Sequence, residues 1–288
     1  MTDASTAPLL MRWVGFDMDE CIGSLMPLYT FVTELPEFAK EEKPDQVWNI
    51  LIHALVRSEL SRKTWLIRPA LIGSLNILYE AWVAGKIQGA FVYSNNGSDR
   101  LVRFVASLLN GFITTIHRPR NARLFQMAVS LKTPCRTRGS TDKTFADIQA
   151  CLEAHGLPPA SSPADLLFFD DLEHVLAGEI THYVKVRPYS NYTSVYTLLE
   201  VLDFFKPIVG EAEFQIIAEN AARDQMADLK ARENMYVLEP PTSAERREDT
   251  AMFRDAFARF FRAGMRGGGR TRRWRRCRNR RVSKHKIE

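Results

Sequence analysis

The sequence predicts an α/β protein in which a mostly parallel β-sheet is covered by helices on both faces. Short apolar runs rich in strand-forming residues recur along the chain, and most segments between them carry apolar residues at helical spacing. These runs are apolar throughout, which is typical of strands buried on both faces of a parallel sheet. In such sheets, ligands bind beyond the carboxyl ends of the strands.

The predicted strands are, in chain order, RWVGF (12–16), AFVYS (90–94), FITTIH (112–117), LLFFD (166–170) and YVKVRP (183–188). The predicted helices lie near 28–39, 45–60, 70–84, 98–109, 121–131, 143–155 and 193–205. The segment 25–67 is too long for a single crossover between strands, so we expect a helical insertion there, after the first strand.

Two more helices are predicted toward the carboxyl end, over 211–234 and 243–263. Pro240 and Pro241 break the helical pattern between them, and Ser243 can cap the second helix. We therefore expect a core over 1–209 that contains the insertion, a helical extension over 210–264 and a tail over 265–288.

The tail carries most of the positive charge of the chain. From Arg266 onward there are eleven Lys or Arg and one acid, so the tail has a net charge of +10; subtracting this from the +5 of the whole chain leaves −5 for residues 1–265. A dense block of like charges after three glycines is predicted to be disordered when free. Its composition suits nucleic acid or another polyanion, bound through 266–286, although a solubilising appendage without a ligand has the same composition.

The four cysteines (Cys21, Cys135, Cys151 and Cys277) are scattered without a C-x-x-C pair, so we expect reduced thiols and neither disulfides nor a zinc site. MTDASTAPLL does not resemble a secretory signal, and no run approaches the ~20 apolar residues of a membrane helix. These features predict a soluble intracellular protein without membrane partners. The basic tail is compatible with the nucleus, and the cytoplasm or a virion are the other expected locations.

Polar side chains follow three of the predicted strands at the point where each strand ends. Asp17 and Asp19 follow the first strand, Ser94 ends the second, and Asp170 and Asp171 follow LLFF in the fourth. Each signal alone is weak, because acid pairs and hydroxyls are common in loops and at helix caps. Their shared position is what indicates a site.

Lys143 belongs to the same pattern. It stands 27 positions before Asp170, at the start of the helix that leads into the fourth strand. Its ammonium group can offset the charge of a carboxylate that lies beside a phosphate. Lys132 is a second lysine of the same region and competes with Lys143 for this role.

These residue types suit phosphoryl transfer. A carboxylate can attack a phosphoryl group and form an aspartyl-phosphate, while a second carboxylate protonates the leaving group and then activates water. Mg²⁺ prefers hard oxygen ligands, which the two acid loops supply. A hydroxyl with loop N–H groups can hold the equatorial phosphate oxygens.

The ordered acid pair, hydroxyl, lysine and acid pair resemble the haloacid dehalogenase (HAD) superfamily of phosphatases and phosphotransferases, which has a Rossmann-like fold. The resemblance implies that Asp17 is the nucleophile and Asp19 the general acid/base. It makes Ser94 the phosphoryl-binding hydroxyl and Lys143 the stabilising cation.

The same resemblance implies a Mg²⁺ site at Asp17, Asp170 and Asp171, with the backbone carbonyl of Asp19 as a further ligand. Asn95 and Asn96, which continue the loop after the hydroxyl, are the implied substrate-binding residues.

Three segments narrow the resemblance to the NLI-interacting-factor-like phosphatases, the family of RNA polymerase II C-terminal-domain phosphatases. FDMDECIGS is similar to the DLDETLVHS loop of that family, RPALIGSLNIL (68–78) to its "RPGL…FL" helix, and VKVRPYSNYTSVYTLLEVLDFF (184–205) to its ending. The likeness covers 12–205 with gaps over 25–67 and 118–142. Cys21 and Ser94 stand where the family has threonine; Cys21 is interpreted either as a small buried residue or as a reactive thiol.

The implied function is a Mg²⁺-dependent phosphatase acting on a phosphoprotein. A nucleotide or polynucleotide phosphatase of the same fold is an alternative, as is an inactive HAD-like protein that binds nucleic acid or a partner through its tail. A D-x-D such as D-M-D also occurs as a metal-binding motif of nucleotide-sugar glycosyltransferases. That interpretation requires neither Lys143 nor Asp170, so the positions of these two residues are evidence against it. Arginine-dense tails of this kind resemble those of large DNA virus proteins, so a viral protein is a further expectation.

Overall fold

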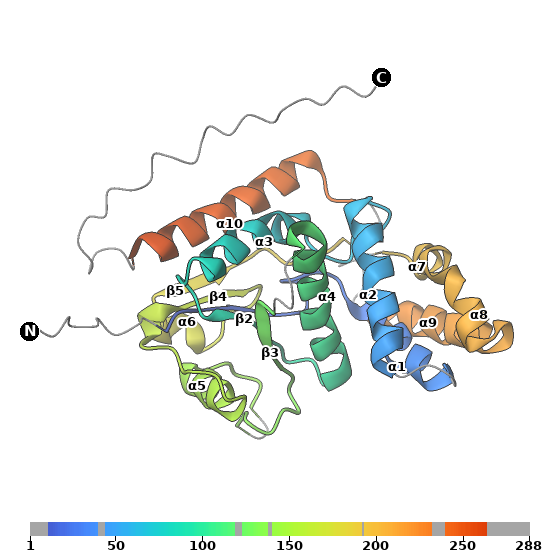
Figure 1. The fold of residues 1–288 in the computed structure, drawn as a ribbon, viewed down its shortest axis with the longest axis horizontal. Helices are drawn as coiled ribbons and strands as arrows, with labels where there is room; N and C mark the ends of the chain where they lie inside the picture. Colours follow the sequence, from blue (N-terminus) through green and yellow to red (C-terminus); the bar gives the residue numbers. More distant parts are fainter. Residues whose placement is uncertain are drawn as a thin grey trace, which may run out of the picture.

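The computed structural model describes residues 11–39, 44–118, 123–137, 140–191, 193–231 and 240–263. Its centre is a five-stranded sheet in which all neighbouring strands are parallel and the order is β3-β2-β1-β4-β5 (Figure 1). The strands are β1 (Trp13–Phe16), β2 (Gly89–Tyr93), β3 (Phe125–Val129), β4 (Leu166–Asp170) and β5 (His182–Lys185). The strand that precedes Asp17 thus lies in the middle of the sheet, between the strands that precede Ser94 and Asp171.

Helices surround this sheet. The α-helices are α1 (Tyr29–Phe38), α2 (Pro44–Leu60), α3 (Pro69–Val83), α4 (Asp99–His117), α5 (Phe145–Ala154), α6 (Leu176–Glu179), α7 (Val195–Leu202), α8 (Lys206–Val209), α9 (Glu211–Ala231) and α10 (Ser243–Ala263). Short 3₁₀ turns cover Met26–Leu28, Pro163–Asp165 and Asp203–Phe205.

Alternate residues of the apolar strands face two separate cores. Phe16 and Phe169 belong to the larger core, with helices α3, α4 and α10, whereas Trp13 and Phe168 belong to a smaller core with α5 and α6. Figure 1 shows these helices on opposite faces of the sheet. Side chains alternate between the faces of a strand, so burial on both faces requires an unbroken apolar run. The predicted α/β class, the parallel sheet and the helices on both faces are confirmed.

The two C-terminal helices pack in different places. Helix α10 covers the sheet beside α3, where the rings of Phe253 and Phe257 lie 4.8 and 5.3 Å from the ring of Phe169 (Figure 1). Helix α9 packs on the insertion, and Asp224 accepts a hydrogen bond of 2.6 Å from Thr30 of α1. The segment that we expected as an extension over 210–264 therefore contributes to both the core and the insertion.

Two predicted elements are wrong. FITTIH (112–117) is not a strand but the last part of α4, because its buried residues Phe112 and Ile113 continue the helical spacing set by Leu108 and Leu109. Conversely, the helix predicted over 121–131 is replaced by β3. Strand β3 lies at the sheet edge and alternates between buried and half-buried residues, the pattern of a strand with one covered face.

The helix predicted over 98–109 is present as α4 but continues to His117. The other predicted elements are present within a few residues of their predicted bounds, including the helical insertion over 25–67. Among the described helices, none combines the length and apolar character that crossing a bilayer requires. The basic tail over 265–288 and its polyanion-binding segment 266–286 lie outside the described residues.

The expectation of reduced thiols is wrong for two cysteines. Cys135 and Cys151 form a disulfide that joins the loop after β3 to helix α5, while Cys21 is a free, buried thiol. The pairing depends on the fold, since it links residues 16 positions apart that share no recognisable motif. Cys277 lies outside the described residues.

Candidate active site

The acid loop, Asp17 to Ser24, starts as a continuation of β1. The backbone N–H of Asp17 donates to the carbonyl of Phe169 in β4 at 2.8 Å, which holds Asp17 at the carboxyl edge of the sheet. The loop then turns tightly: Ile22 N–H donates to Met18, and Glu20 has a φ of 59°. That left-handed conformation is uncommon for a residue with a Cβ, so the surrounding contacts must hold it in place.

Lys143 joins the two acid loops. Its Nζ lies 2.5 Å from Asp17 Oδ1 and 2.7 Å from Asp170 Oδ2, so the ammonium group contacts both carboxylates. The lysine side chain is 1% exposed. It reaches the acids from the residue before the cap of α5, because Thr144 is the N-cap of that helix. Lys132, the competing lysine, is exposed at the surface.

Burial dominates the electrostatics of these groups. It raises the pKa of Asp17 to about 8, against the opposing effect of Lys143. Burial, together with the neighbouring Asp170, raises the pKa of Asp171 to about 6. Burial would lower the pKa of Lys143, but the two carboxylates outweigh it and keep the pKa above its ordinary value. The site thus holds more carboxylate than one lysine can neutralise.

The three buried acids fit a divalent cation. Asp17, Asp170 and Asp171 each offer an oxygen within 4.8 Å of the others. Hard carboxylate oxygens are the ligands that Mg²⁺ prefers, and a divalent charge would balance three carboxylates beside one ammonium group. The carboxylate of Asp19 is outside this cluster; its implied contribution was the backbone carbonyl, which stays a prediction.

Ser94 stands at the end of β2, next to the acid loop. It is 1% exposed, and its N–H donates to Val129 of β3 at 2.8 Å. Its Oγ accepts a hydrogen bond of 3.0 Å from the backbone N–H of Asn96. The hydroxyl hydrogen is therefore left to donate to another oxygen, as a phosphoryl-binding group must.

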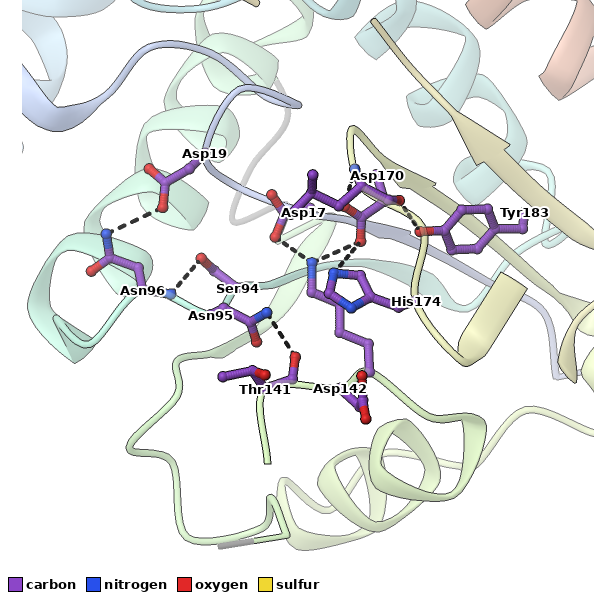
Figure 2. A network of polar contacts seen from close by, with 12 residues as sticks. Asp17, Asp19, Ser94, Asn95, Asn96, Thr141, Asp142, Asp170, His174 and Tyr183 are labelled. Carbon is purple, nitrogen blue, oxygen red and sulfur yellow. Dashed lines mark hydrogen bonds and ion pairs between the residues drawn. The ribbon is translucent and has the colours of Figure 1, made fainter. Parts of the chain in front are cut away.

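The two asparagines after Ser94 make intramolecular contacts. Asn96 Nδ2 donates to Asp19 Oδ2 at 3.2 Å, and this contact turns the Asp19 carboxylate toward the Ser94 loop in Figure 2. Asn95 Nδ2 donates to the carbonyl of Thr141 at 2.8 Å. Both side chains thus orient other parts of the site, and their implied role in binding substrate stays a prediction.

Sequence reasoning missed the buried arginines that support these loops. Arg68 is 0% exposed and donates to the carbonyls of Glu20 and Cys21, both at 2.9 Å, so it supports the turn of the acid loop. Arg136 is 5% exposed and donates to the Ser94 carbonyl at 2.9 Å. Arg68 begins the RPALIGSLNIL segment, which was a usable signal, whereas nothing in the sequence marks Arg136.

His174 was also missed, although it follows the second acid pair. Its Nε2 lies 3.8 Å from Asp170 Oδ2, and burial followed by the charge of Lys143 lowers its pKa. Cys21, in contrast, is fully buried, and burial with the charge of Asp17 raises its pKa. A buried thiol with a raised pKa is unreactive, which favours the small buried residue over the reactive thiol.

Comparison of the chain with protein-family models, with curated proteins and with solved structures gave no match. The functional interpretation therefore rests on the site itself: two acid loops, a buried lysine between them and a serine hydroxyl, assembled at the carboxyl edge of a parallel sheet.

Proposed function

We propose that this protein is a Mg²⁺-dependent phosphatase that works through an aspartyl-phosphate on Asp17. The observation that carries the proposal is the position of Lys143, buried between Asp17 and Asp170 at the ends of neighbouring strands. A buried lysine costs desolvation free energy, and a structural role would be served by one carboxylate. A cation held in contact with both acid loops lies where it can offset the charge of a carboxylate nucleophile and of a phosphate bound beside it.

In the proposed first step, a carboxylate oxygen of Asp17 attacks phosphorus and the bond from phosphorus to the leaving oxygen breaks. Asp19 gives its proton to that oxygen. Lys143 reduces the repulsion between the Asp17 carboxylate and the phosphate, and the Ser94 hydroxyl donates to a phosphoryl oxygen. In the second step, Asp19 takes a proton from a water molecule that attacks phosphorus, which frees Asp17 and releases inorganic phosphate.

Asp17, Asp170 and Asp171 would hold Mg²⁺, and the bound ion would supply positive charge to the phosphoryl oxygens. The donor set fits this ion, because the three buried acids lie close together and exceed the positive charge present.

A phosphorylated serine or threonine of a protein is the first substrate class to test, following the likeness of the acid loop. Nucleotide and polynucleotide phosphates are the second. The site favours a slender phosphomonoester, since Asp17 is 6% exposed and Ser94 and Lys143 are each 1% exposed. A panel of phosphopeptides and nucleotides, assayed with Mg²⁺, separates the two classes.

The direct test is hydrolysis of p-nitrophenyl phosphate with Mg²⁺ by the wild type and by Asp17→Asn. Loss of turnover is expected in the variant, because an amide cannot form the covalent intermediate. Asp203→Asn, a change of an exposed acid whose side chain is 66% exposed, is the matched control and should keep full turnover. Equal turnover in Asp17→Asn would refute the proposal. Beryllofluoride with Mg²⁺ should place its phosphate mimic on Asp17 in a structure of the complex.

A further inference from the structure

Arg136 contacts the Ser94 loop twice. Its Nη1 donates to the Ser94 carbonyl and its Nη2 to Asn95 Oδ1, both at 2.9 Å. The guanidinium also lies 4.7 Å from the centre of the Tyr93 ring in β2. The planar fork of arginine is suited to binding two acceptors at a fixed separation, which lysine cannot do. Arg136 therefore fixes both the position and the orientation of this loop.

The same contacts reach the segment that carries Lys143. The amide of Asn95 accepts from Arg136 through its oxygen and donates through its nitrogen to the Thr141 carbonyl, as Figure 2 shows for the second bond. Arg136 Nη2 also lies 3.4 Å from the carbonyl of Asp142. One arginine and one asparagine thus connect the hydroxyl-bearing loop to the lysine-bearing segment.

The backbone around Arg136 is anchored to helix α5 on both sides. On one side Cys135 is bonded to Cys151 of that helix, and on the other the N–H and hydroxyl of Thr137 donate to Asp147 Oδ1. Helix α5 begins directly after Lys143 and its cap. The base of the arginine and the base of the lysine are therefore held by one helix, so their separation is set by a rigid element.

We propose that Arg136 is a positioning residue that sets the distance between the Ser94 hydroxyl and the Lys143 ammonium group. This inference rests on the proposed phosphatase function for its effect on turnover, while the coupling between the two segments is a property of the fold. Without the guanidinium, the carbonyl of Ser94 loses its buried partner and the Asn95 amide loses one of its two contacts. The hydroxyl would then no longer be held where the transferring phosphoryl group needs it.

The test compares Arg136→Ala and Arg136→Lys with Arg100→Ala. Arg100 is a matched control on α4, because its side chain is 53% exposed and paired with Glu37 away from the site. Kinetics with p-nitrophenyl phosphate and Mg²⁺ should show kcat lowered at least ~10-fold in Arg136→Ala with KM changed less than ~3-fold, since the positioned donor acts mainly in the transition state. Arg136→Lys, which keeps one of the two bonds, should recover part of kcat. Arg100→Ala should match the wild type.

Hydrogen exchange provides a readout that needs no turnover. In Arg136→Ala, amides in 94–98 and 140–144 should both exchange faster, whereas Arg100→Ala should leave both unchanged. Wild-type kcat in Arg136→Ala would overturn the inference while the proposed function stands, and so would a loss of kcat that Arg136→Lys does not relieve. If the wild type hydrolyses nothing, the proposed function fails, and the exchange of the two segments alone decides whether Arg136 couples them.

Discussion

Arg68 and Asp249 form a buried ion pair that connects helix α10 to the acid loop. Arg68 Nη1 lies 2.7 Å from Asp249 Oδ2, and the two side chains are 0% and 10% exposed. The remaining guanidinium nitrogens donate to the carbonyls of Cys21, Glu20 and Arg187. A residue of the last described helix thereby neutralises the cation that supports the turn after Asp17.

Replacing Arg68 should therefore destabilise the whole domain. Arg68→Ala leaves the buried Asp249 with only the longer contact of 3.8 Å to Arg187, and it removes the donor of three carbonyls. We therefore expect a loss of about 3–5 kcal/mol in the free energy of unfolding. Urea unfolding of Arg68→Ala, Asp249→Ala and the double variant measures the interaction free energy between the two side chains. The double variant should lose clearly less than the sum of the single losses; strict additivity would contradict the pair.

Lys143 should be needed for turnover. Lys143→Met removes the charge between Asp17 and Asp170, so we expect a fall of at least ~100-fold in kcat for p-nitrophenyl phosphate. Lys132→Met, a change of the exposed lysine of the same region, is the control and should retain wild-type kcat. Loss of turnover in Lys132→Met with none in Lys143→Met would transfer the role to Lys132.

Gly23 should not tolerate a side chain. A Cβ there would lie 1.9 Å from the carbonyl oxygen of Leu66, where the acid loop pairs with the end of the insertion. Gly23→Ala must push these backbones apart, and we expect a loss of about 3 kcal/mol in unfolding free energy. Gly73→Ala is the control: a Cβ at this position in α3 would have nothing within 4 Å, so the variant should gain up to about 1 kcal/mol. Equal midpoints in urea for the two variants would contradict the close approach.

Glu59 should make stability fall as pH rises. It is buried and accepts hydrogen bonds from the N–H groups of Leu66 and Ile67, at 2.8 and 3.3 Å. Burial raises its pKa from 4.5 to about 7, so between these values the unfolded chain has released a proton that the folded protein keeps. The free energy of unfolding should therefore fall by about 3 kcal/mol as pH rises from 4.5 to 7.

The measurement is urea unfolding of the wild type and Glu59→Gln across this range, because the variant cannot titrate at this position. The difference between their unfolding free energies isolates Glu59 from other groups that titrate there, such as Asp171. A difference that does not change with pH would show that Glu59 has an ordinary pKa in the folded protein.

The Cys135–Cys151 disulfide should contribute to stability. It closes a segment of 16 positions, and loop-closure entropy predicts that Cys135→Ser/Cys151→Ser loses about 3 kcal/mol in unfolding free energy. Alkylation of the unfolded wild type should leave Cys135 and Cys151 unlabelled without a reductant and should label both after reduction, whereas Cys21 should be labelled in either case. Labels on Cys135 and Cys151 without a reductant would mean that these cysteines are not paired.

Local pattern was enough for most of the fold and for the acids of the candidate site. Unbroken apolar runs located β1, β2 and β4, and the polar residues at their ends are the ones the sheet brings together. The apolar pattern predicted the wrong element where the strand preference of a few residues competed with the helical spacing of a longer segment. The β-branched residues Ile113 and Thr114 favour a strand, but α4, which begins far upstream, extends through both of them and has Ile113 on its buried face.

Apart from the RPALIGSLNIL segment that begins at Arg68, the contacts that support the site could not be predicted from the sequence. No sequence spacing connects the residues that make these contacts. Arg68 contacts Asp249, which lies 181 positions further along the chain, and Arg136 contacts Ser94, which lies 42 positions before it. Such contacts exist only once helices and strands are packed, so a single sequence gives no sign of them. The motifs located the acids, the serine and the lysine of the candidate site, and they missed most of the residues that hold these groups in place.

Strand β1 has consequences for how the chain folds during synthesis. Its two neighbours are β2 and β4, and Asp17 donates to Phe169, so β1 leaves the ribosome long before its second partner exists. The ion pair between Arg68 and Asp249, which supports the acid loop, can form only later, after Asp249 has left the ribosome. Between the synthesis of β2 and that of β4, the nascent chain therefore carries a central strand that can pair on one side only, and Arg68 lacks its carboxylate partner until Asp249 is made. Chaperones and aggregation compete for the chain in this interval.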